Sequence, residues 1–160
     1  MATASKTSPT APACSLSEPD ANAWFGLLRA HGSLVRAVDA ELMAAHRLSM
    51  SSHEVLYRLA RAADGHLSVS ELAQQLPISP SRVSRVVDDL VAKGFVERRS
   101  CPGDARVSHV AITAHGRESL GAIDDTFHAA IHEHFLERLS RREVETLASA
   151  WRKLGATGGC

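Results

Sequence analysis

The sequence predicts a mainly helical domain of the α+β class. Four motifs in which Ser is followed three residues later by Asp or Glu mark helix starts, because the two side chains cap each other's backbone N–H groups. They begin at Ser17, Ser51, Ser68 and Ser140. Apolar residues then recur at steps of three and four, as on one face of a helix. Between residues 95 and 112 the period changes to two, which is typical of β-strands.

Composition narrows the class of protein. With 160 residues, 44% of them hydrophobic, the chain is long enough for one domain with its own core. No apolar run reaches the roughly 18 residues of a membrane helix, and the first ten residues lack the apolar segment of a signal peptide. We therefore expect a cytoplasmic protein without membrane association. Three cysteines, at positions 14, 101 and 160, are too few and too far apart for a disulfide framework or a zinc site.

The N-terminal half reads as an arm followed by two helices. Residues 1–16 are rich in Ser, Thr, Ala and Pro and predict a flexible arm. A helix is expected from Ser17 to about His46. One face of it carries Trp24, Leu28, His31, Val35, Val38 and Leu42. A second helix is expected from Ser51 to about Ala63, where Asp64-Gly65 ends it.

Two short helices and a hairpin follow. The first opens at Ser68, carries Leu72 and Leu76, and is closed by Pro77. The second starts at Ser79-Pro80 and ends at Gly94, a residue type suited to a helix C-terminus. Its inner face is expected to hold Val83, Val87, Leu90 and Val91. Residues 95–99 and 107–112 then read as two strands around the turn Pro102-Gly103-Asp104.

The C-terminal part predicts two more helices and a tail. Thr113 is expected to cap a long helix that reaches about Leu136, with Leu120, Ile123, Phe127 and Ile131 on its apolar face. The last helix follows Ser140 and carries Val144, Leu147, Trp151 and Leu154. Residues 155–160 form a tail.

Two short helices joined at residues 76–79 and followed by a hairpin favour a winged helix-turn-helix. The second of these helices presents hydroxyl and guanidinium groups that suit DNA. Hydroxyls and N–H groups at a helix N-terminus bind phosphates, and Arg can pair with a guanine edge. The candidates are Ser79, Ser81, Arg82, Ser84 and Arg85. The same residues would also suit an ordinary solvated helix, so the hairpin decides between the two interpretations.

The hairpin is basic although the chain as a whole has a net charge of zero. Residues 79–106 contain six basic and four acidic side chains. Arg98 and Arg99 lie in its first strand. Asp104 and Arg106 flank one residue at the turn, where the carboxylate can orient the guanidinium. An Arg at a hairpin tip can enter a minor groove. We therefore predict that Arg98, Arg99, Asp104 and Arg106 complete a DNA-binding surface.

Residues 67–106 resemble the winged helix-turn-helix of the MarR (multiple antibiotic resistance regulator) family. The resemblance rests on the Asp-x-Arg pair at 104–106, on Leu-x-x-x-Gly-Phe-Val-Glu-Arg at 90–98, and on Ile-Thr-x-x-Gly at 112–116. Together these motifs are specific, and the likeness extends over roughly residues 21–154. It implies one domain over residues 17–154. The winged helix-turn-helix would occupy about 48–112, and dimerisation helices about 17–46 and 114–154.

The resemblance also implies a function. It points to a homodimeric transcriptional regulator, in most cases a repressor, that binds double-stranded DNA at a pseudo-palindromic operator. Repression and activation both stay open. Family members are released by small effectors, often aromatic and anionic, bound between the dimer helices and the DNA-reading lobe. By position the candidates for such a pocket are Trp24, His31, His53, Tyr57 and Arg58. Each of them can equally be a packing or surface residue.

Three alternatives remain in view. A thiol switch at Cys101 would use the neighbouring Arg98 and Arg99 to lower the pKa of the thiol. A metal sensor would use His128 and His132, one helical turn apart, with further ligands from His53, Glu54 or a partner chain. A winged-helix module that binds proteins instead of DNA is the third. The sequence has no Gly-rich phosphate loop, nucleophile elbow or tight carboxylate pair, so we expect neither an enzyme nor a bound cofactor.

Overall fold

The computed structural model describes residues 16–101 and 104–155, and between residues 100 and 108 it describes the backbone without side chains. The chain divides into two compact units, residues 1–33 and 34–160. The predicted arm up to residue 15, residues 102–103 of the predicted turn and the tail from residue 156 lie outside the described part. The expected single domain over residues 17–154 stays a prediction.

Helix α1 spans Glu18–His46 and crosses from the first unit into the second. It begins as expected, because the Ser17 hydroxyl accepts the backbone N–H of Asp20 at 3.4 Å. Of its predicted apolar stripe, Val38 and Leu42 are buried, whereas Trp24 and Leu28 are about half exposed. The helix ends at His46, and the next residue, Arg47, adopts the left-handed conformation with φ 57°.

Helix α2 (Met50–Arg61) begins one residue before the predicted start at Ser51, and its capping residue lies two residues earlier than predicted. The Ser51 motif does not cap it. Ser49 does, by accepting the N–H of Ser52 at 3.1 Å. The reason is a residue on another helix: the Asp39 carboxylate of α1 accepts the N–H of Met50 at 2.7 Å. That bond satisfies one of the first-turn N–H groups, so the first turn forms earlier than the local sequence indicates.

The helix-turn-helix consists of α3 (Val69–Gln75) and α4 (Pro80–Ala92). The capping box at Ser68 is confirmed: its hydroxyl accepts the N–H of Glu71 at 3.1 Å, and the Glu71 carboxylate accepts the N–H of Ser68 at 2.7 Å. This second bond holds the pKa of the Glu71 carboxyl below its usual value. Helix α4 is capped by Ser79, starts at Pro80, and is followed by Gly94 at φ 77°, all as predicted.

One prediction for α4 is wrong in detail. Val86 belongs to the buried face, whereas Val91 is 37% exposed. The buried positions 83, 86, 87 and 90 follow the spacing i, i+3, i+4, i+7. Position 91 lies one step beyond this arc.

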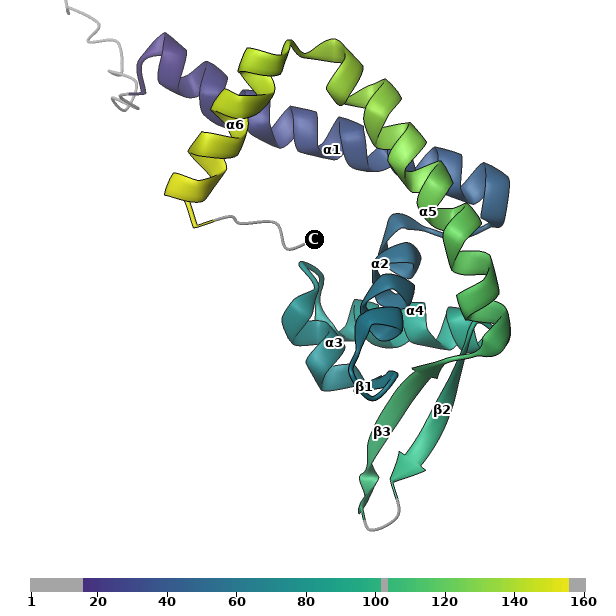
Figure 1. The fold of residues 1–160 in the computed structure, drawn as a ribbon. Helices are drawn as coiled ribbons and strands as arrows, with labels where there is room; N and C mark the ends of the chain where they lie inside the picture. The colour runs from purple at the N-terminus through teal and green to yellow at the C-terminus, as the bar shows by residue number, and fades with distance from the viewer. Residues whose placement is uncertain (1–15, 102–103, 156–160) are drawn as a thin grey trace, which may run out of the picture. The chain divides into compact units, whose positions relative to one another are not determined.

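The sheet has three antiparallel strands in the order β1-β3-β2. Strands β2 (Val96–Cys101) and β3 (Asp104–Ile112) form the predicted hairpin, longer than expected, with Val96 opposite Ile112 and Arg98 opposite Val110. In Figure 1 the hairpin projects away from α2, α3 and α4. Strand β1 (His66–Ser68) pairs with the inner end of β3 and was not predicted. Three residues are too few for a period of two to show.

Helix α5 (Ala114–His134) is followed by a 3₁₀ turn η1 (Leu136–Arg138) and by α6 (Arg141–Lys153). The predicted caps are confirmed: Thr113 accepts the N–H of Gly116 at 3.0 Å, and Ser140 forms a capping box with Glu143. The side chain of Ser140 in this box lowers the pKa of the Glu143 carboxyl. Within residues 16–101 and 104–155, no helix is long and apolar enough to cross a membrane.

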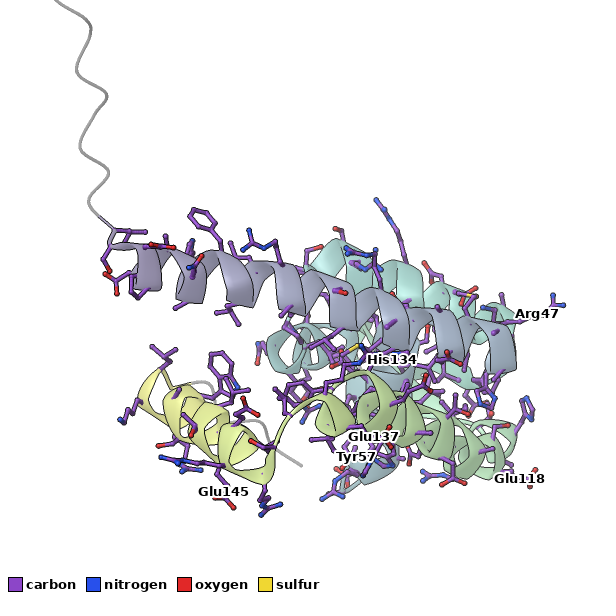
Figure 2. The ribbon with its side chains drawn as sticks, turned by 90° about the horizontal axis from the view of Figure 1, so that it is seen from above. Arg47, Tyr57, Glu118, His134, Glu137 and Glu145 are labelled. Atoms are coloured by element: carbon purple, nitrogen blue, oxygen red, sulfur yellow. The ribbon has the colours of Figure 1, made fainter. Side chains whose placement is uncertain are left out.

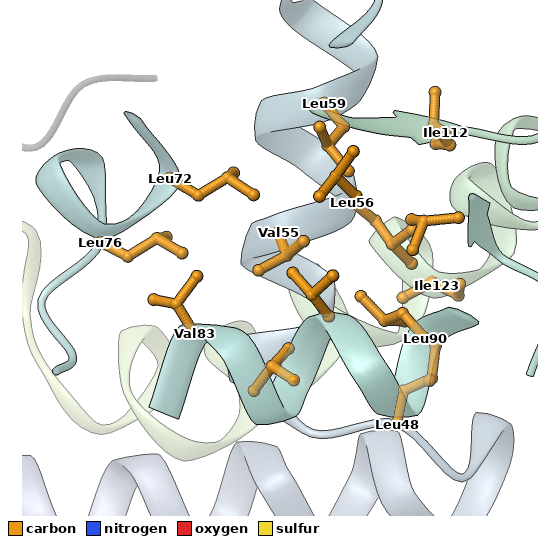
Figure 3. Close-up of a cluster of buried hydrophobic side chains, with 14 of the residues drawn as sticks. Leu48, Val55, Leu56, Leu59, Leu72, Leu76, Val83, Leu90, Ile112 and Ile123 are labelled. Carbon is orange, nitrogen blue, oxygen red and sulfur yellow. The ribbon is translucent and has the colours of Figure 1, made fainter. Parts of the chain in front are cut away.

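The core lies where α2, α3, α4, α5 and β3 meet. Figure 3 shows side chains from the four helices converging: Leu56 and Leu59 of α2, Leu72 of α3, Leu90 of α4 and Ile123 of α5. The four leucines are fully buried, and Ile123 is 1% exposed. Burying such side chains stabilises the fold by roughly 2 kcal/mol each. The helix-turn-helix and the base of the hairpin are therefore fixed to one rigid support.

Candidate nucleic-acid interface

Helix α4 has one buried and one open side. Val83, Val87 and Leu90 are fully buried, whereas Ser81, Arg82 and Arg85 are exposed. Helical spacing places Ser81, Ser84 and Arg85 opposite the buried valines, with Arg82 on the flank. Ser84 is half-buried. The residues selected from the sequence thus form one continuous polar face on a helix whose opposite side is packed against the core.

The N-terminus of α4 is ordered by its own cap. The hydroxyl of Ser79 accepts the backbone N–H of Arg82 at 3.4 Å, and it lies 3.2 Å from the hydroxyl of Ser81. Pro80, which has no N–H, occupies the first helical position. The helix dipole adds partial positive charge at this end. Two hydroxyls and the helix N-terminus therefore meet beside Arg82, an arrangement that attracts phosphate oxygens.

The first turn of α5 packs against the base of the hairpin. The carbonyl oxygen of Phe95, just before β2, accepts the backbone N–H of Thr113 at 3.0 Å. The Thr113 hydroxyl donates to the carbonyl oxygen of Gly94 at 2.7 Å and lies 3.1 Å from that of Phe95. Gly116 of α5 lies directly against the carbonyl of Phe95: a Cβ at position 116 would stand 2.2 Å from the oxygen. The first turn of α5 thus fixes where the hairpin leaves the core.

The predicted arginines of the hairpin are partnered by carboxylates. The guanidinium of Arg98 lies 2.6 Å from a carboxylate oxygen of Asp88 on α4. Arg99 lies 2.7 Å from Glu97 on its own strand. Among the described residues, by contrast, Arg82 and Arg85 form no ion pair. Of the four basic side chains, the two on α4 are therefore the ones open to a new anionic partner.

Asp104 and Arg106 lie on the backbone of β3, but their side chains are outside the described residues. The orientation of Arg106 by Asp104 stays a prediction. The same holds for the thiol hypothesis at Cys101, whose side chain is also outside the described part.

The five residues considered for an effector pocket are distributed over both units. Trp24 and His31 lie on the exposed N-terminal part of α1, in the first unit. His53, Tyr57 and Arg58 lie on α2, in the second. Tyr57, labelled in Figure 2, is half-buried, and the guanidinium of Arg61 lies 5.4 Å from the centre of its ring. Arg58 is half-buried as well.

His53 is a packed residue. It is 4% exposed, its Nε2 lies 2.6 Å from a carboxylate oxygen of Asp124 on α5, and its ring stacks on Phe127 at 4.2 Å. Burial lowers the pKa of His53, although the hydrogen bond to Asp124 opposes the shift. The ring nitrogen Nδ1 is buried without a hydrogen bond among the described groups. The neutral imidazole therefore donates from Nε2 to Asp124.

The second unit contains a cavity of about 300 Å³ that none of these five residues lines. Its walls are apolar and come from α1 (Leu34, Val35 and Val38), from Met50 of α2, and from the stretch of α5 and its end between Phe127 and Phe135. His134, labelled in Figure 2, is the polar side chain in this lining, and its Nε2 is buried without a hydrogen bond. The volume is at the lower end of the range for small-molecule sites.

No metal centre emerges from the histidines that the structure describes. Among these residues no group of three His, Cys, Asp or Glu side chains could hold a metal ion. His132 instead approaches Glu137 at 3.6 Å. The pair of His128 and His132 therefore lacks a third ligand within the described chain.

Two acidic residues of the sites were not singled out from the sequence. Asp88 was counted only as part of the charge balance, yet it contacts Arg98. Its position three residues after Arg85 places it on the open face of α4, which is a signal the sequence contained. Asp124, the partner of His53, lies 71 residues away in the chain, and no local pattern connects the two.

Helix α3, a short turn, the capped helix α4 and the hairpin of β2 and β3 follow one another in the chain. This arrangement defines a winged helix-turn-helix protein. Comparison with known proteins shows which family this part of the chain resembles. Residues 48–107, which contain the winged helix-turn-helix, match the model of the MarR family. The chain is therefore similar to the MarR family of transcriptional regulators over its winged helix-turn-helix.

Curated relatives cover much of the chain. The transcriptional repressor MprA of Escherichia coli is 27% identical over 114 residues, which are 71% of this chain. The chain spans 64% of the length of MprA. The regulator MhqR of Bacillus subtilis is 29% identical over 112 residues, 69% of this chain and 74% of MhqR. Both relatives are transcriptional regulators by name, which agrees with the prediction that the chain is not an enzyme.

The fold class is confirmed by solved structures. The MarR family regulator Sco3205 of Streptomyces coelicolor, solved in complex with DNA, is 25% identical with a TM-score of 0.79, over 88% of each chain. The prediction of a mainly helical winged-helix fold therefore holds.

Proposed function

We propose that this protein is a sequence-specific DNA-binding regulator that acts as a homodimeric repressor and is released by a small ligand. The observation that carries the proposal is the open face of α4. Ser81, Arg82 and Arg85 are exposed there, and the opposite side of the helix is fixed to the core. A rigidly supported helix of this kind fits a major groove, which admits one α-helix. Sco3205, which has the same fold, was solved in complex with DNA, and this supports DNA binding by the proposed surface.

In this mechanism α4 and the hairpin have separate roles. The N-terminus of α4 holds phosphates through Ser79 and Ser81, while Arg82 or Arg85 donates two hydrogen bonds to a guanine edge. Arg106 of the hairpin enters the neighbouring minor groove. Bound at a promoter, the protein would exclude other proteins from the same DNA.

Exposed apolar side chains support a homodimer. On the N-terminal part of α1, Trp24, Phe25 and Leu28 are each about half exposed, and at the end of α6 Leu154 is 72% exposed. Helix α6 has no buried residue within the chain. Such apolar surface is unfavourable in water and is covered in an interface between subunits. A two-fold dimer would place two copies of α4 about one DNA turn apart, on a pseudo-palindromic site.

The cavity beside α5 supports an effector of apolar or aromatic character. It is lined by α1, α2 and α5, so a ligand in it would contact the helix that carries His53 and the helix to which the hairpin is attached. A ligand releases the protein from DNA only if it binds the free conformation more tightly than the DNA-bound one. Half-buried His134, whose Nε2 lies 3.8 Å from a carboxylate oxygen of Glu41, is the polar residue among the lining side chains and could orient a ligand.

The test is binding of the purified protein to overlapping duplexes from the DNA around its own gene, in a series of salt concentrations. We expect one short pseudo-palindrome bound near nanomolar, with random duplex bound at least about 1000-fold more weakly. Equal affinity for the flanking DNA and for random duplex at 150 mM salt would refute the proposal. Weak, sequence-blind binding would favour a winged-helix protein-interaction module.

Substitutions separate the two roles. Arg82→Ala or Arg85→Ala should cost about 1–3 kcal/mol of operator binding and relax specificity at one base pair. Arg106→Ala should weaken binding to all sequences and reduce the salt slope by about 1. Arg138→Ala, an exposed arginine outside this surface, is the matched control. An Arg106→Ala protein with the affinity of the parent at every salt concentration would refute the role of the hairpin.

A further inference from the structure

A carboxylate lies in the middle of the surface proposed to face DNA. Asp88 is exposed and follows Ser81 by seven residues and Arg85 by three, so it occupies the same open side of α4. A negative charge at this place repels phosphates. Its presence on an anion-binding face therefore calls for a function that is not itself DNA contact.

The partner of Asp88 indicates that function. Its carboxylate oxygen Oδ1 lies 2.6 Å from Nη2 of Arg98, which belongs to β2 of the hairpin. Short charge-assisted bonds of this kind are directional as well as strong. The pair is an ion pair between α4 and the hairpin, whereas Arg99–Glu97 lies within one strand and Lys93–Asp89 lies within one helix.

We propose that Asp88 is a positioning residue that fixes the hairpin relative to α4 and thereby sets discrimination between the operator and other DNA. The inference rests on the function proposed above. A hairpin held at one angle to α4 reaches the minor groove only on DNA of the matching geometry. A hairpin released from α4 can adapt to any duplex, so the difference between operator and other DNA becomes smaller.

The size of the effect follows from exposure. The side chain of Arg98 is 36% exposed and that of Asp88 is 63% exposed, so water and salt screen the pair. Ion pairs at such places change an equilibrium by up to about fivefold. We therefore expect exchange rates and DNA affinities to change about two- to fivefold. A matched control variant is needed to assign changes of this size to the ion pair.

Asp89→Asn provides this control. Asp89 is the next residue of α4, is about half exposed, and pairs with Lys93 at 2.7 Å on the same helix. Asp89→Asn removes the same charge from nearly the same place but leaves the contact between α4 and the hairpin intact. A long-range effect of charge would appear in both variants. An effect of hairpin position would appear in Asp88→Asn alone.

The first measurement uses the free protein and hydrogen exchange of the backbone amides. Asp88→Asn should speed exchange in β2 and β3 about two- to fivefold relative to the parent, and Asp89→Asn should not. Reversal of the pair, Asp88→Arg with Arg98→Asp, should slow exchange again. Equal exchange in Asp88→Asn and Asp89→Asn would overturn the proposal, whether or not the protein binds DNA.

The second measurement uses the full chain with its operator and with random duplex. Asp88→Asn should raise the affinity for random duplex about two- to fivefold and lower the ratio of the operator affinity to the random-duplex affinity. Asp89→Asn should change both affinities in parallel. If Asp88→Asn leaves the ratio of the parent unchanged, the proposal is wrong while the proposed function stands. If the parent itself does not discriminate, the proposed function fails and the exchange experiment alone decides the role of Asp88.

Discussion

Gly116→Ala tests how closely α5 approaches the root of the hairpin. Gly116 is buried in the first turn of α5. A Cβ there would lie 2.2 Å from the carbonyl oxygen of Phe95 and 2.8 Å from Cγ1 of Ile112. The carbonyl is backbone and cannot rotate away. It also accepts the backbone N–H of Thr113 at 3.0 Å, so a shift of α5 would stretch this hydrogen bond.

The magnitude follows from three contributions. Overpacking of a closed site costs about 1–3 kcal/mol, and loss of one Thr113 bond adds about 1 kcal/mol. The better helix propensity of Ala returns about 1 kcal/mol. Because the contact is far inside the normal separation, the upper part of this range applies. We expect Gly116→Ala to lower the free energy of unfolding by about 2–3 kcal/mol.

Gly121→Ala on the same helix is the control. A Cβ at position 121 would meet nothing within 4 Å. This variant should therefore gain about 1 kcal/mol of stability. The assay is urea unfolding followed by circular dichroism, at one fixed protein concentration because a dimer unfolds at a concentration-dependent midpoint. Stability of Gly116→Ala equal to or above that of the parent would refute the close approach of α5 to Phe95.

Three further predictions concern stability. Burial lowers the pKa of His53, so the unfolded chain binds a proton more strongly than the folded one. The parent should lose stability as the pH falls below about 6.5, by up to about 1.4 kcal/mol per pH unit. His53→Gln should remove this pH-dependent loss. Urea midpoints between pH 5.5 and 7.5 that run parallel for both proteins would contradict the role of His53. Arg47→Gly should stabilise the protein by about 1 kcal/mol, because φ 57° costs any residue with a Cβ, whereas Arg36→Gly inside α1 should destabilise it by about as much. Figure 2 shows the side chain of Arg47 extending away from the helices, so its loss removes no packing; a lower thermal midpoint for Arg47→Gly would argue against this account. Asp39→Ala should cost about 1 kcal/mol by leaving the N–H of Met50 without its acceptor, and Asp125→Ala, exposed on α5, should cost much less in the same thermal unfolding experiment.

Local signals in the sequence were sufficient for most helix boundaries. The starts at Ser68, Ser79, Thr113 and Ser140 are capped by the side chains that the sequence indicated. Each cap depends on residues within three positions of one another, so a short motif contains all the needed information. The start of α2 could not be predicted in this way, because the acceptor of the Met50 N–H is Asp39, which is 11 residues away on another helix.

The same distinction separates what could be predicted of the site. The open face of α4 follows from helical periodicity alone, and its serines and arginines lie where the sequence placed them. The pairs Asp88–Arg98 and His53–Asp124 join elements 10 and 71 residues apart in the chain. The two residues of each pair lie on different elements, and only the tertiary fold brings these elements into contact. Periodicity within one element cannot reveal such pairs.

The charge balance constrains how the proposed interface can reach high affinity. Residues 79–106 carry an excess of only two positive charges, and Arg98 and Arg99 already contact carboxylates. One protomer can therefore neutralise few phosphates, and its sequence-independent affinity should be low, because each phosphate contact contributes separately to the salt-dependent part of binding. A low background has a useful consequence: discrimination is a difference between two affinities, and it grows when the unspecific one is kept small. Tight binding then requires two protomers on one operator, each supplying its own base contacts. On this argument the paired carboxylates of the surface and the proposed two-fold dimer serve the same end, which is binding that depends on sequence more than on charge.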